Sequence, residues 1–241
     1  MAAYGALLLV PAVAQDRGYH HFSDCRKIAS VPNFYNVISN FLFLIFGSVG
    51  LFITLYLRER TTKDLMLPAN LSFFTGIFLT GIGSSYYHLD PSLDTLVWDR
   101  LPMTITFMAF FSIIISEHID LVAGRKFLPH LLFLGIMSVV YWYKTEQNGQ
   151  GDLRPYILVQ FLPLLLIPII LLLFRSESQF AFYYWCMLLV YALAKTFECF
   201  DAEVFSCAKI ISGHSLKHLF ASLTPLIYLL KLWNQMVLNR V

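Results

Sequence analysis

Seven apolar runs, each long enough to cross a membrane as a helix, follow one another along the chain with short polar connections. A helix needs about 20 predominantly apolar residues to span a hydrocarbon core of about 30 Å. Because backbone groups find no water to bond in hydrocarbon, such runs must fold as helices. The sequence therefore predicts an all-α membrane protein, a seven-transmembrane-helix bundle. The predicted spans are 37–57, 70–88, 99–119, 126–143, 156–174, 180–200 and 214–237.

The composition agrees with a membrane protein. Apolar residues make up 58% of the chain and charged residues 13%, against about 45–50% and 25% in soluble domains. We expect an N-terminal segment at 1–36, one transmembrane domain at 37–237 and a short tail at 238–241, with no separate soluble domain. The net charge of +2, without a Lys/Arg-rich run, argues against a nucleic-acid partner.

The ends of the chain and its orientation are less constrained. Residues 3–14 are apolar over about 12 positions but contain Pro11, so we expect an interfacial segment rather than a span. Lys and Arg outside the spans divide 7 against 8 between the two faces, which leaves the orientation open. We expect a multi-pass protein of the endoplasmic reticulum or Golgi in a eukaryote, or of the inner membrane in a bacterium. The oligomeric state is open.

Polar residues gather at the ends of three predicted spans. Ser84 and His88 end the second, Asp99 begins the third, and His214 and His218 lie in the first two turns of the seventh. Successive spans alternate in direction, so all five residues share one side of the membrane whatever the orientation. Ionisable residues inside spans are costly and usually functional.

The spacing of these residues favours a metal site. His214 and His218 are four residues apart, as are Ser84 and His88, and residues four apart lie on one face of a helix. Three imidazoles with an open position are the arrangement of catalytic zinc, and Asp99 beside them can accept a proton from water. Taken singly, each histidine is more simply explained as a hydrogen-bonding group near the headgroups.

Other polar residues have simpler explanations. Lys195 and Glu198 predict an internal ion pair, although Glu198 or Asp201 can instead hold a metal-bound histidine by its second nitrogen. Cys25 and Cys207 can form a link in an oxidising compartment. We expect the remaining histidines and one acid to be interfacial, namely His20, His21, Glu117, His118 and His130. No GxSxG, HExxH or Walker motif occurs, which argues against serine-hydrolase, HExxH-protease and nucleotide-driven mechanisms.

The spaced Ser/His/Asp/His/His set, with WDRLPM around Asp99 and DCRKIASVPNFYNVISN before the first span, resembles the alkaline ceramidase family. That family belongs to the superfamily of the adiponectin and progestin membrane receptors. The resemblance covers nearly the whole chain. It implies that His88, His214 and His218 bind zinc, that Asp99 is the general base and then acid, and that Ser84 helps to hold the site and stabilises the oxyanion.

The implied reaction is hydrolysis of the amide bond of ceramide, which releases a sphingoid base and a fatty acid. Animal members carry an acidic calcium-binding cluster before the first span. This chain has Arg26 and Lys27 after Asp24, and Asn33 where an acid is expected, so we do not expect calcium. Arg100 stands where animal members tend to have Glu, so phytoceramide or another acylated lipid is an alternative substrate. A zinc-containing receptor or sensor, and a transporter that uses Lys195 and Glu198, are the rival functions.

Overall fold

The structure is a computed structural model that describes residues 10–58, 66–174 and 180–238. The predicted segment at 3–14 and the C-terminal tail lie largely outside these ranges. The described residues form helices and no named strand, with one isolated bridge between Ile28 and Val31. The helices are η1 (Arg17–His20), α2 (Phe34–Ile38), α3 (Phe41–Arg58), α4 (Leu67–Leu89), α5 (Leu93–His118), α6 (Leu121–Gln147), α7 (Arg154–Leu173), α8 (Ala181–Cys199), α9 (Asp201–Ala208) and α10 (Gly213–Leu238).

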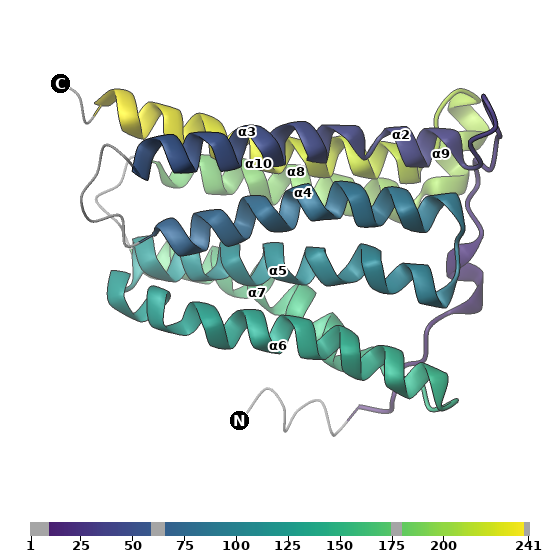
Figure 1. Ribbon diagram of the computed structural model, residues 1–241, viewed down its shortest axis with the longest axis horizontal. Coiled ribbons are helices and arrows are strands. Elements are labelled where there is room, and N and C mark those ends of the chain that lie inside the picture. Colours follow the sequence, from purple (N-terminus) through teal and green to yellow (C-terminus); the bar gives the residue numbers. More distant parts are fainter. Residues whose placement is uncertain (1–9, 59–65, 175–179, 239–241) are drawn as a thin grey trace.

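The long helices run lengthwise beside one another and alternate in direction (Figure 1). Helix α4 packs between α3 and α5, α5 also contacts α6 and α7, and α10 packs against α8 and α3. Their shared core contains the buried aromatic residues Phe73, Phe74, Tyr184 and Tyr228. The end of α4 and the starts of α5 and α10 meet at one end of the bundle, where α2 and α9 also lie.

Four stretches in the described part of the chain are long and apolar enough to cross a membrane, which identifies the protein as membrane-embedded. They are Phe34–Tyr56, Leu93–His118, Leu121–Gln147 and Arg154–Leu173. Helices α4, α8 and α10 are outside this set. Two of them carry charged residues within the apolar sequence, Lys195 and Glu198 in α8 and Lys231 in α10.

The third predicted span starts earlier than expected. The Ser92 hydroxyl accepts from the backbone N–H of Thr95 at 3.2 Å, and the Thr95 hydroxyl accepts from that of Ser92 at 3.0 Å. This capping box satisfies N–H groups that the first turn leaves free, so α5 begins at Leu93. Asp99, expected at the helix start, lies in its second turn.

Pro102 therefore lies inside α5, beyond its first turn. Proline has no N–H, so the carbonyl of Trp98 has no helical partner four residues on. Gly83 of α4 packs against that carbonyl, since a Cβ at residue 83 would lie 1.9 Å from the Trp98 oxygen. This close approach sets α4 against α5 where both carry candidate site residues.

The far end of the bundle contains a buried polar cluster that sequence reasoning did not find. Of Glu117 and His118, both expected to be interfacial, His118 is buried and the side chain of Glu117 is 10% exposed. Lys231, which is fully buried, forms an ion pair with Glu117. The Tyr184 hydroxyl donates to the other Glu117 oxygen at 2.6 Å. The two charges stay in the interior because each has a partner there.

The four cysteines are free thiols, so the link considered between Cys25 and Cys207 is not formed. Both of these side chains are exposed. Cys25 lies in the N-terminal segment and Cys207 in α9.

Candidate metal centre

Three imidazole rings meet at the end of the bundle. His88 lies in the last turn of α4, and His214 and His218 lie one turn apart at the start of α10. One ring nitrogen from each lies within 4.8 Å of the other two, and the Nε2 atoms of His88 and His214 are 3.3 Å apart. The three residues are 0%, 6% and 4% exposed. This buried cluster can hold a metal ion.

One ring is held by a serine that the sequence did not single out. The Ser39 hydroxyl lies 2.8 Å from Nδ1 of His218, at the break between α2 and α3. A partner on the outer nitrogen fixes the orientation of an imidazole and the tautomer that it adopts. Ser39 gives no sign of this role in its local sequence, because 179 residues separate it from His218.

Asp201 holds the backbone at the start of α10 and not a histidine ring. Its Oδ1 accepts from the backbone N–H of His214 at 2.6 Å. The start of α10 also packs closely on the end of α8, since a Cβ at Gly213 would lie 2.2 Å from the carbonyl oxygen of Phe197. These contacts correct the expectation that Asp201 acts as the carboxylate behind an imidazole.

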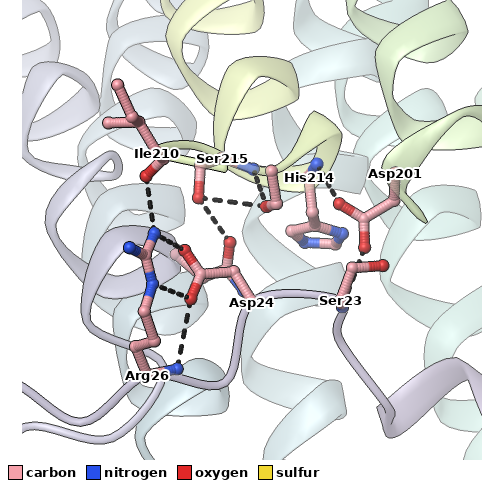
Figure 2. Close-up of polar contacts among 9 residues, drawn as sticks. Ser23, Asp24, Arg26, Asp201, Ile210, His214 and Ser215 are labelled. Atoms are coloured by element: carbon pink, nitrogen blue, oxygen red, sulfur yellow. Dashed lines mark hydrogen bonds and ion pairs between the residues drawn. The ribbon is translucent and has the colours of Figure 1, made fainter. Parts of the chain in front are cut away.

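The N-terminal segment covers the histidines. The ring centroid of Phe22 lies 4.6 Å from that of His88 and 4.7 Å from that of His214. Figure 2 shows how the next residues are attached: the Ser23 N–H donates to Oδ2 of Asp201 at 3.1 Å. Since Asp201 also bonds to His214, one carboxylate joins the covering segment to the start of α10.

Arg26 attaches the same segment a second time. Its guanidinium forms an ion pair with Asp24 at 2.6 Å and donates to the carbonyl of Ile210 at 2.5 Å (Figure 2). Burial raises the pKa of Asp24, but the hydrogen bonds and charge of Arg26 outweigh this effect and hold that pKa below its usual value. The Asp24 carboxylate is therefore already paired with the Arg26 guanidinium.

Asp99 and Ser84 lie beside the histidines in one cavity. They are 7% and 2% exposed. Both line a cavity of about 220 Å³ that His218 also borders. The five residues predicted from the sequence are therefore gathered at one end of the bundle.

A lysine between the two histidines of α10 was missed by sequence reasoning. Nζ of Lys217 lies 3.0 Å from Nε2 of His214 and donates to Oε1 of Glu198 at 3.0 Å. Glu198 also forms the predicted ion pair with Lys195. A lysine inside an apolar helix, three residues after one candidate ligand and directly before another, was a signal that could have found it.

The fold and the site together define a membrane-embedded helical protein with a buried three-histidine centre and a buried carboxylate beside a cavity. The chain belongs to the ceramidase family, whose model, described as "Ceramidase", matches residues 25–238. All five predicted site residues lie within that range.

A curated relative carries a related name. "Putative alkaline ceramidase dcd3B" of Dictyostelium discoideum is 26% identical over 127 residues, which cover 45% of this chain and 45% of that protein. The chain therefore spans less than half the length of this relative.

Proposed function

We propose that the protein is a zinc-dependent amidohydrolase that cleaves the amide bond of ceramide or phytoceramide and releases a sphingoid base and a free fatty acid. One observation carries this proposal. In a chain of the ceramidase family, His88, His214 and His218 form a buried cluster whose His218 shares a cavity with Asp99.

The donor set fits zinc. Zinc binds imidazole nitrogen at about 2.0–2.1 Å in tetrahedral geometry, which separates two ligand nitrogens by about 3.3 Å. The Nε2 atoms of His88 and His214 are 3.3 Å apart. Calcium and magnesium prefer oxygen ligands, which these rings do not offer. We propose no calcium site, because the carboxylate of Asp24 is bound by Arg26.

The residues of the chain then have distinct roles. Bound zinc would acidify water and polarise a carbonyl group. The Asp99 carboxylate accepts a proton from the water that attacks the amide carbon, and gives it to the nitrogen as the C–N bond breaks. The Ser84 hydroxyl, which borders the same cavity, donates its one O–H to the oxyanion that develops on the carbonyl. The products are a carboxylic acid and an amine.

The setting suits a lipid substrate. The cavity wall includes the apolar side chains of Phe43, Met103, Ile157 and Phe161, against which acyl chains can pack. We also propose that α3 to α8 and α10 each cross the bilayer. Labelling of single cysteines placed in the connections would test this count, since successive connections must alternate in accessibility from the two sides.

The test of the reaction uses purified protein in lipid nanodiscs, with metal analysis and release of fatty acid from ceramide measured on the same sample. We expect about one zinc per chain in the wild type. His214→Ala should lose both zinc and turnover. Asp99→Asn should keep zinc and lose turnover by about 10²-fold or more, because it removes the proton acceptor.

His130→Ala is the matched control, because His130 is an exposed histidine of α6 and should change neither measurement. Turnover that survives loss of the metal in His214→Ala would contradict the zinc mechanism. Full turnover in Asp99→Asn would contradict the role of Asp99.

A further inference from the structure

Arg100 is a buried cation with an unsatisfied nitrogen. The residue is 5% exposed, and its guanidinium carbon lies 4.1 Å from the ring centroid of Trp142 and 4.7 Å from that of Tyr156. Its Nη2 donates to Oε1 of Gln15 at 2.6 Å. Its Nη1 is buried and has no hydrogen-bond partner among the described residues.

This arrangement leaves Nη1 of Arg100 without a hydrogen-bond acceptor from the part of the protein that the structure describes. Aromatic faces attract a guanidinium, but these rings leave Nη1 without a hydrogen-bond acceptor among the described residues. A buried charge is costly unless it is paired and hydrogen-bonded. An oxygen atom from a bound molecule would supply the missing partner.

Arg100 lines the same cavity as Asp99 and Ser84. The cavity has two other basic side chains, Lys195 and Lys217, and both are paired with Glu198. Within the described part of the chain, Arg100 has no carboxylate partner. It is therefore the basic group of this cavity with donor capacity left for a ligand.

We propose that Arg100 binds the head-group oxygen of the substrate and makes the site selective for N-acylated 2-amino-1-alcohols or their phosphate esters. This inference rests on the proposed amide hydrolysis. In such a lipid, two carbons separate the amide nitrogen from the terminal oxygen. Asp99 and Arg100 are consecutive residues and both border the cavity, so one bound lipid can contact both side chains.

The test removes each partner of the proposed bond in turn. The zinc-loaded full chain and its Arg100→Met variant are assayed with ceramide and with 1-deoxyceramide of the same acyl length, which lacks the head oxygen. Hydrogen bonds to charged groups correspond to about 10- to 100-fold in kcat/KM. We expect Arg100→Met to lose that factor with ceramide and less than about 3-fold with 1-deoxyceramide. Arg100→Lys should recover part of the loss, because it keeps a cationic donor.

Ceramide 1-phosphate distinguishes the two sources of the oxygen. A larger effect of Arg100→Met on this lipid than on ceramide assigns the position to a phosphate, and a smaller effect assigns it to a hydroxyl. Equal losses on all three lipids would overturn the proposal, because a purely structural arginine affects every substrate alike. Lys126→Gln on the exposed face of α6 is the control for loss of a positive charge.

Binding measurements separate this proposal from the proposed reaction. Short-chain ceramide and its 1-deoxy analogue are titrated into metal-free wild-type protein and the Arg100→Met and Arg100→Lys variants, with binding followed by calorimetry. If the zinc-loaded wild type fails to hydrolyse ceramide although the metal-free wild type binds it, the proposed reaction fails, while the comparison of the variants still decides the role of Arg100. If the wild type binds both lipids equally, the head oxygen makes no bond there and the proposal is wrong.

Discussion

Replacement of Gly83 by alanine should separate two helices at the site. Ordinary contact begins at about 3.4 Å, and a Cβ at residue 83 would lie 1.9 Å from the carbonyl oxygen of Trp98. The helices must therefore move apart by about 1.5 Å, and the atom in the way is rigid backbone. Overpacking of this kind destabilises the folded protein by about 1–3 kcal/mol. The higher helix propensity of alanine relative to glycine stabilises the helix by about 1 kcal/mol.

Because the obstructing atom is rigid backbone, we take the upper end of this overpacking cost, about 3 kcal/mol, so the expected net effect of Gly83→Ala is a destabilisation of about 2 kcal/mol. Ser84 and His88 follow residue 83 on α4, and Asp99 follows Trp98 on α5. The displacement therefore also opens the site, and a misplacement of about 1 Å can reduce turnover by about 10²-fold. Thermal unfolding in nanodiscs, zinc content and ceramide hydrolysis would be measured on the same preparation.

Gly135→Ala is the matched control. Gly135 is also inside a helix, but its added Cβ would lie 3.0 Å from the flexible Met108 Cγ and 3.2 Å from the Thr104 backbone oxygen, so a shift of a few tenths of an ångström relieves both contacts. We expect the free energy of unfolding of this variant to lie within about 1 kcal/mol of the wild-type value, and we expect the variant to keep its zinc. A Gly83→Ala protein as stable as the wild type, with full zinc content, would refute the reasoning, because helix propensity alone would then govern the position.

Two further predictions concern the contacts around the histidines. Ser39→Ala should weaken zinc binding by about 10- to 100-fold, the usual effect of removing a partner behind a ligand, as measured by competition with a chelator; unchanged affinity would contradict the role of Ser39. Arg26→Gln should speed amide hydrogen exchange at residues 23–26, whereas Lys27→Gln, an exposed neighbour, should not. Because the pKa of Asp24 is lowered from 3.8, its pairing with Arg26 stabilises the folded segment above that pH and is lost as the pH falls below it; wild-type protection at residues 23–26 that does not fall as the pH is lowered through the acid range would contradict this.

The helical, membrane-embedded character of the protein could be predicted because it depends on local properties of the chain. An apolar run of about 20 residues has few alternatives to a helix in hydrocarbon, whatever lies elsewhere. The start of α5 could have been predicted too. Ser92 and Thr95 form a capping box, but the polar residues around them favoured a loop.

The meeting of the three histidines was also predictable, for a reason of geometry. Helices that alternate in direction place the end of α4 and the start of α10 at one end of the bundle, and a spacing of four residues puts His214 and His218 on one face. No such rule links Ser39 to His218, Lys231 to Glu117 or Phe22 to His88. These pairs are separated by 179, 114 and 66 positions in the sequence.

The sequence by itself thus determined which segments are helices and which ends of those helices carry polar groups, since both follow from hydrophobicity and helical period. Only the tertiary structure decided which partner each polar group has. Asp201 bonds to a backbone N–H rather than a ring, and Arg100 lies among aromatic rings with one nitrogen unsatisfied. The physical reason is that a buried polar group takes whichever partner the packing of distant helices brings within about 3 Å, and no local pattern records that distance.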